Sequence, residues 1–256
     1  MISSGRRRTP SAGRAPLRLG VPGFAHPLVA PAEWGGLRRT GLPLDWVVIG
    51  GSSLRETGGV AGGPGSRPDP CWLSAAAPLR AAGARVLGRL DLLYGRRDLG
   101  ELLADAQRFL NWYKVDGFSL DRCPADHAGL AAVRRATGAL RTLLDRAHLV
   151  LVHGTHPCAG YAGLADQLVT FTGPWSAYRW SQVAEWTVDH PPGRFCHLVH
   201  GVPRRHLDEA LRIARWQGAG TVWLTDRTDH DDVDPWESMP GYWDEIVSRI
   251  GPGVSE

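Results

Sequence analysis

The sequence predicts a single-domain (β/α)8 barrel, and three observations support this. Eight short apolar runs bounded by turn residues are spread along the chain, and segments with helical spacing of apolar residues lie between them. The chain has 256 residues, of which 43% are hydrophobic, and a barrel of this class uses about 250 residues as one domain. Strands that alternate with helices eight times favour a closed parallel barrel over an open doubly wound sheet.

Taken in order, the eight predicted strands are short apolar runs bounded by turn residues. They span residues 17–24, 46–50, 85–91, 116–121, 148–153, 167–172, 194–200 and 221–226. The clearest helical pattern between them places apolar residues three and four apart, at Leu99, Leu102, Leu103, Ala106, Phe109 and Leu110. Residues 50–70 are rich in Gly, Pro and Ser and predict a long loop after the second strand.

The two ends of the chain are expected to lie outside the barrel. Residues 1–16 contain Arg6, Arg7 and Arg8 but no apolar core behind them, so they do not resemble a secretory signal and predict a disordered arm. Residues 17–250 form the barrel, and residues 251–256 form a tail.

Composition narrows the cellular setting and the class of partner. The net charge of +3, from 29 basic and 26 acidic residues, is too weak to predict nucleic-acid binding. Four cysteines stand singly, which indicates reduced thiols rather than a disulfide framework. No apolar run approaches the roughly 20 residues of a membrane span. We therefore expect a cytoplasmic protein that binds neither nucleic acid nor a membrane.

The stretch from Asp116 to Arg122 is the most informative part of the sequence. It is an apolar run that ends on a carboxylate, Asp121, and follows an aromatic-rich helical segment. In a parallel barrel the loops after the strands form the working face, so Asp121 is expected at a functional rim. The alternative is that Asp121 only caps the next helix.

Strand periodicity predicts which side chains meet inside the barrel. Asp91 shares a face with Arg89, and Asp121 shares one with Ser119. A buried guanidinium such as Arg89 needs a carboxylate partner, which Asp91 or Asp121 would supply. The ring of polar strand ends comprises His26, Asp91, Asp121, His153 and Asp226. An ion network that only fixes strand register is the alternative, but so many polar ends favour a ligand site.

Metal and cofactor signals are weak. His153 and His156 are three residues apart but lie at a junction between strand and loop, and residues 229–234 match only part of a calcium loop. We expect no metal and no cofactor. Trp175 and Trp236 lie just past strand ends, where we expect flat rings to stack on a sugar ring or on another ligand with an apolar face. Trp34, Trp72, Trp112 and Trp216 lie in helical patterns and are expected in the core.

Several of these segments resemble one known family. They are residues 21–27 (VPGFAHP), 83–95 (GARVLGRLDLLYG), 112–121 (WYKVDGFSLD), 165–175 (ADQLVTFTGPW), 194–200 (RFCHLVH) and 234–236 (DPW). Over residues 17–245 the chain is similar to the bacterial members of the spherulin-4 (spherulation-specific family 4) proteins. The resemblance implies a (β/α)8 fold of glycoside hydrolase type, and the studied fungal members cut galactosamine-containing exopolysaccharide.

The chain departs from the family pattern at several strand ends. Arg122 stands where the family typically has a second acid directly after Asp121, and Thr172 stands where it has a Glu. The family's Asn-Pro pairs are replaced by Gly50-Gly51 and by Val152-His153. Glycosidic cleavage needs two carboxyl groups, so the expected catalytic pair is Asp121 with Asp91.

Arginine beside Asp121 is expected to lower the pKa of that carboxyl, which is the wrong direction for a general acid. The expected substrate-binding residues lie at or just after strand ends. They are His26, Arg89, Tyr94, Arg122, His153, Thr172, Trp175, His200, Asp226 and Trp236.

Three functions fit these residues. The first is a glycoside hydrolase-like protein that acts on an amino-sugar glycan with a degenerate acid pair. The second is a carbohydrate-binding pseudoenzyme. The third is a barrel repurposed for another small-molecule reaction, with His153, His26 or Asp226 as acid or base. Fold alone does not separate them.

Overall fold

A computed structural model of the chain describes residues 16–50, 62–230 and 234–250. The predicted arm, apart from residue 16, and the predicted tail lie outside the described residues, as do residues 51–61 of the predicted long loop and residues 231–233 of the acidic segment.

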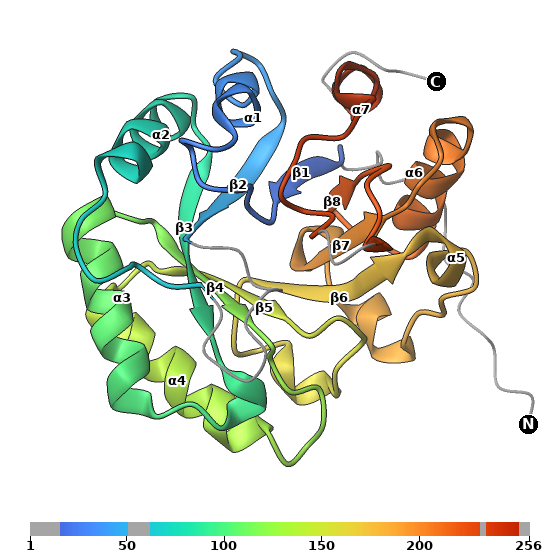
Figure 1. Cartoon of the computed structure of the whole chain (residues 1–256). Coiled ribbons are helices and arrows are strands. Elements are labelled where there is room, and N and C mark those ends of the chain that lie inside the picture. The colour runs from blue at the N-terminus through green and yellow to red at the C-terminus, as the bar shows by residue number, and fades with distance from the viewer. Residues whose placement is uncertain (1–15, 51–61, 231–233, 251–256) are drawn as a thin grey trace, which may run out of the picture.

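Eight parallel strands close into one barrel in sequence order, with β1 paired to β8 (Figure 1). The predicted fold class is therefore confirmed. The strands are β1 (Arg18–Val21), β2 (Leu44–Ile49), β3 (Arg85–Asp91), β4 (Gly117–Asp121), β5 (His148–Val152), β6 (Gln167–Pro174), β7 (Phe195–His200) and β8 (Thr221–Leu224). Each coincides with a predicted run, and the bounds differ by up to three residues.

Helices surround the strands as an outer layer (Figure 1). They are α1 (Pro31–Gly36), α2 (Pro70–Ala81), α3 (Leu99–Tyr113), α4 (Leu130–Leu143), α5 (Trp175–Tyr178), α6 (Leu207–Trp216) and α7 (Trp243–Ile250). In α3 the Asp98 carboxylate accepts a hydrogen bond from the Glu101 N–H at 3.0 Å and so caps the first turn. Phe109 of α3 packs where Gly88 of β3 leaves space, since a Cβ there would lie 2.7 Å from the Phe109 ring.

The helix layer is thin around β6. In the described chain between β5 and β6, the only helical segment is a 3₁₀ turn at Ala159–Tyr161. Gly154, Pro157, Gly160 and Gly163 interrupt this connection and prevent a regular helix. After β6, the four-residue α5 and two 3₁₀ turns take the place of a long helix.

Buried polar side chains form a hydrogen-bonded network inside the barrel. The Trp46 indole N–H donates to the Gln167 side-chain oxygen at 2.7 Å, and the Gln167 amide donates to Asp45 at 2.6 Å. Gly20 permits this arrangement, because a Cβ at that position would lie 2.4 Å from the Trp46 ring. The Trp46 indole, held in place by this network, is part of the lining of the cavity described below.

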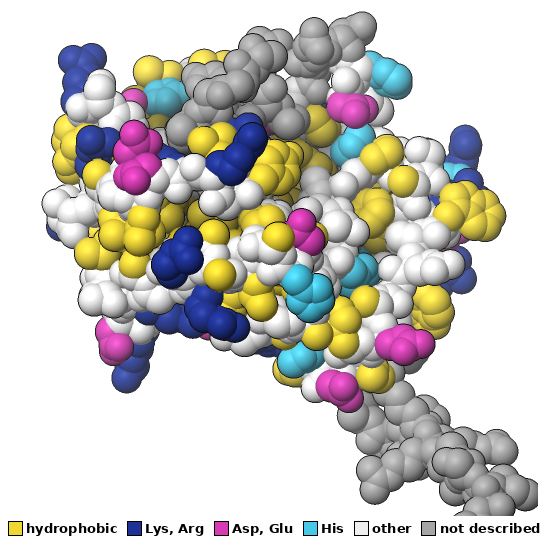
Figure 2. Space-filling view, turned by 90° about the horizontal axis from the view of Figure 1, so that it is seen from below, with side chains coloured by type: hydrophobic (Ala, Val, Ile, Leu, Met, Phe, Trp, Pro, Cys, Tyr) yellow, Lys and Arg dark blue, Asp and Glu magenta, His cyan; other side chains and the backbone are white. Residues whose placement is uncertain are grey.

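Figure 2 shows an outer face of the molecule on which basic side chains stand in separate groups with acidic, histidine and hydrophobic side chains between them. Trp34 and Trp72 are buried as expected, and Trp112 packs partly buried against the core. The expectation for Trp216 is wrong, because its side chain at the end of α6 is 76% exposed. None of the described helices is both long and apolar enough to cross a membrane.

Candidate functional site

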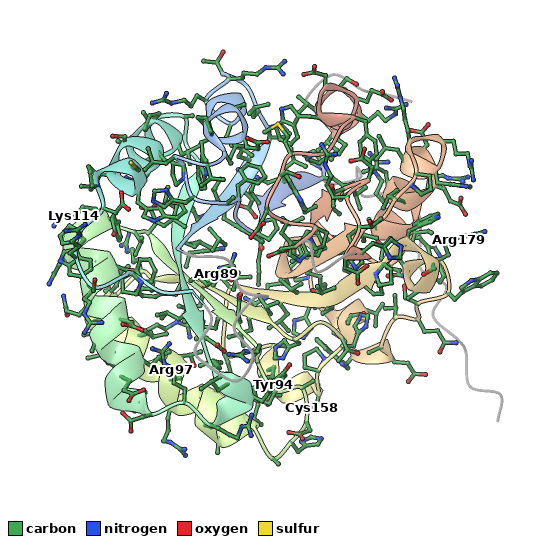
Figure 3. All side chains as sticks on the ribbon, in the orientation of Figure 1. Arg89, Tyr94, Arg97, Lys114, Cys158 and Arg179 are labelled. Atoms are coloured by element: carbon green, nitrogen blue, oxygen red, sulfur yellow. The ribbon has the colours of Figure 1, made fainter. Side chains whose placement is uncertain are left out.

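A cavity of about 270 Å³ opens at the C-terminal mouth of the barrel. Seven of the expected site residues line it, namely Arg89, Tyr94, Asp121, Arg122, His153, Thr172 and Trp236. In Figure 3, Arg89 lies at the centre of the ring of strands, whereas Lys114 and Arg179 lie at the outer edge. Residues at or near the ends of β3, β4, β5 and β6 therefore converge on one cavity.

Asp121 is held at the end of β4 by two donors. The Arg89 guanidinium donates to its Oδ2 at 3.1 Å, and the Ser119 hydroxyl donates to its Oδ1 at 3.1 Å. The expected carboxylate partner of Arg89 is thus observed.

The expected direction of the Asp121 pKa is wrong. Burial raises the pKa of this carboxyl and outweighs the lowering by Arg89, and the negative charges of Asp91 and Asp234 raise it further. A raised pKa suits a group that donates a proton.

Asp91 is aligned with Asp121 across β3 and β4, but its carboxylate is absent from the described lining of the cavity. The side chain is fully buried and pairs with the Arg122 guanidinium, whose Nε donates to both carboxylate oxygens at 2.9 and 3.0 Å. Each carboxylate is thus paired with its own arginine. This geometry does not favour the expected role of Asp91 as second catalytic acid.

The end of β6 contributes Thr172 to the cavity. Thr172 is aligned with Leu198 of β7, which also lines the cavity. Its hydroxyl is buried and makes no hydrogen bond within the described part of the chain. Trp236 lines the cavity with its ring 5.7 Å from His200 and nearly perpendicular to it.

His153 follows directly after β5 and lines the cavity together with Val152 and Gly154. The ring packs 4.8 Å from Tyr161, and its Nδ1 lies 2.9 Å from the Pro124 carbonyl oxygen. Burial lowers the pKa of His153 to about 4, so the imidazole is neutral at pH 7.

Two expected binding residues serve as loop anchors outside the cavity. His26 accepts a hydrogen bond from the Leu28 N–H at 3.3 Å and donates to Asp69 at 2.9 Å, so it ties the loop after β1 to the start of α2. Asp226 accepts from the Gly241 N–H at 2.8 Å.

Trp175 and His200 are also outside the described lining. Trp175 is buried against Tyr178 and His206, and the Arg179 guanidinium lies 5.7 Å from its ring. His200 is buried behind Trp236, and burial lowers its pKa.

The sequence pattern of spherulation-specific family 4 matches residues 59–250. The chain belongs to spherulation-specific family 4.

Spherulin-4 of Physarum polycephalum is 23% identical over 221 residues, which cover 82% of this chain and 64% of the relative. The chain therefore spans less than two thirds of that relative. The crystal structure of Sph3 from Aspergillus clavatus in complex with GalNAc superposes with a TM-score of 0.74 at 22% identity, covering 92% of this chain and 98% of Sph3.

Active domain 2 of a thermostable chitinase from Pyrococcus furiosus, solved with chito-oligosaccharides, gives a TM-score of 0.53 at 14% identity. It covers 94% of this chain and 97% of the chitinase chain. The fold is therefore shared with glycoside hydrolase-like barrels.

Six residues of the lining were not among those expected from the sequence, namely Pro22, Trp46, Ser119, Val152, Gly154 and Leu198. Ser119 shares its strand face with Asp121, and register alone would have added Val152 and Leu198. Pro22 and Gly154 lie in loops whose course strand alternation does not predict. In the described residues there is no group of three or more His, Cys, Asp or Glu side chains able to hold a metal ion.

Proposed function

We propose that the cavity binds one amino-sugar unit of a glycan, and that the chain does not hydrolyse the glycan by the usual route through two carboxyl groups. One observation carries this proposal. Among the described residues that line the cavity, Asp121 alone has a carboxylate, and β6 contributes Thr172. Glycoside hydrolysis requires one carboxyl to protonate the leaving oxygen and a second to attack or to activate water.

The composition of the cavity supports a sugar ligand. Trp236 and Tyr94 offer flat aromatic surface, on which the apolar face of a sugar ring stacks. Asp121, Ser119 and Thr172 offer oxygen atoms for hydroxyl or amide groups. A volume of about 270 Å³ suits one sugar unit rather than a long oligosaccharide. The complex of Sph3 with GalNAc makes N-acetylgalactosamine the first ligand to test.

A weak hydrolase is the second candidate, and the pKa of Asp121 favours it. Because burial raises the pKa of this carboxyl, Asp121 retains a proton to a higher pH than an exposed aspartate. In that case the cavity lacks only the second carboxylate that hydrolysis requires.

The test combines calorimetric titration of GalNAc with release of reducing ends from a partly deacetylated galactosamine polymer. Thr172→Glu places a carboxylate on β6 within the lining of the cavity. Thr155→Glu is the matched control, because Thr155 is exposed and outside the described lining. Asp121→Asn in the Thr172→Glu background removes the acid.

We expect GalNAc binding without turnover in the wild type, turnover in Thr172→Glu and none in the double variant or in Thr155→Glu. Turnover by the wild type that Asp121→Asn abolishes would replace this proposal with the weak hydrolase. Neither binding nor turnover in any variant, with native circular dichroism, would refute both carbohydrate functions and leave a barrel repurposed for another reaction.

A further inference from the structure

Asp91 lies where two loops of the cavity rim begin. Its fully buried carboxylate accepts a hydrogen bond from the Leu93 N–H at 2.8 Å, in the loop after β3. The same carboxylate accepts from the Arg122 guanidinium, in the loop after β4. These loops bring Tyr94 and Arg122 to the wall of the cavity. One carboxylate thus links both loops to the end of β3.

Both loops contain left-handed residues that are not glycine. The φ angles are 47° at Leu93, 57° at Tyr94 and 48° at Arg122. L-residues disfavour this conformation and keep it only where surrounding contacts hold it. The Tyr94 N–H donates to the Arg122 carbonyl at 2.8 Å, which joins the two strained segments.

We propose that Asp91 is a positioning residue, which holds the loops after β3 and β4 so that Tyr94 and Arg122 shape the rim of the cavity. Its consequence for ligand affinity rests on the proposed function, whereas its hold on the loops does not. Asp91 acts through Arg122 and Leu93 and has no part in proton transfer.

The test measures loop order and ligand affinity separately. Asp91→Asn keeps the shape of the side chain but presents an amide in place of a charged acceptor for the guanidinium. We expect amide hydrogen exchange at Tyr94 to become faster by about tenfold or more, and affinity for GalNAc to fall by about tenfold, as for the loss of one charge-assisted hydrogen bond. Asp116→Asn is the matched control, since Asp116 accepts from the Val86 N–H at 2.8 Å at the opposite end of the barrel.

A rescue variant separates positioning from general stability. Leu93→Gly removes the penalty of the left-handed conformation, so Asp91→Asn with Leu93→Gly should regain much of the protection at Tyr94 and of the affinity. If Asp91→Asn does not fold, Arg122→Lys is measured in the same way, because lysine keeps the charge and loses the forked pairing.

The proposal would be overturned if amide hydrogen exchange at Tyr94 were unchanged in Asp91→Asn, or in Arg122→Lys where that variant replaces it. It would also be overturned if the variant lowered the stability of the fold but left the affinity of the folded protein for GalNAc unchanged. If the wild type binds no GalNAc, the proposed function fails, and exchange at Tyr94 with its rescue by Leu93→Gly still decides the role of Asp91.

Discussion

Arg89→Met tests the electrostatic account of the cavity. The Arg89 and Asp121 side chains are 6% and 15% exposed, and their nitrogen and oxygen atoms lie 3.1 Å apart. Removing one partner of a buried pair costs roughly 3 to 5 kcal/mol. The Ser119 hydroxyl still donates to Asp121 in the variant, so we expect the lower end, about 3 kcal/mol of unfolding free energy at pH 7.5.

The loss should depend on pH in a definite direction. Without Arg89 the pKa of Asp121, already raised by burial, rises further above that of the unfolded chain. A group of this kind destabilises the fold as pH rises above its unfolded value of about 4. The cost of Arg89→Met should therefore be small at pH 4.5 and full at pH 7.5.

Urea unfolding at both pH values measures this difference. Asp121→Asn in the Arg89→Met background removes the unpaired charge, so the double variant should recover part of the stability at pH 7.5. Arg134→Met is the control, since Arg134 is exposed on α4 and should change stability by less than about 0.5 kcal/mol. A loss below about 1 kcal/mol, or the same loss at both pH values, would refute the reasoning.

The other predictions concern the framework that supports the cavity. Gly117→Ala should destabilise the fold by several kcal/mol in urea unfolding, because its Cβ would lie 2.0 Å from the His148 carbonyl oxygen. Gly138→Ala should stabilise the fold by about 0.5 to 1 kcal/mol, because Gly138 is exposed on α4 with open space around it. Equal effects of the two changes would contradict this. Burial lowers the pKa of His197 to about 3, below its ordinary value of 6.5. The neutral ring therefore contributes fully to the stability of the fold above pH 6.5, and this contribution is lost as pH falls below that value. His197→Asn, which keeps a hydrogen-bond partner for the Tyr178 hydroxyl, should give a shallower fall between pH 6 and pH 4, and an unchanged fall would show that other groups cause it.

The barrel could be predicted from the sequence because alternating strand and helix patterns are local. All eight strands and the inward face of Arg89, Ser119 and Asp121 follow from apolar runs and strand alternation. Side-chain direction past a strand end does not follow from alternation, and this explains His26 and Asp226. Both side chains bind to neighbouring loops instead of pointing into the cavity.

Which aspartate pairs with which arginine could not be predicted from the sequence either. Two aspartates and two arginines at neighbouring strand ends allow either pairing, and Arg122, whose backbone is left-handed, pairs with Asp91. The direction of the Asp121 pKa depends on burial, which composition does not reveal. The exposure of Trp216 at the end of α6 could not be predicted either, because Trp216 belongs to a helical pattern of apolar residues whose other members are mostly buried.

The central claim is that the cavity at the mouth of the barrel binds an amino sugar, and a crystal structure after soaking with GalNAc tests it most directly. We expect density for one sugar ring within the cavity, in contact with Asp121, Thr172 and Trp236. An empty cavity at a GalNAc concentration that saturates the protein in calorimetry, with the sugar bound elsewhere on the surface, would contradict the account.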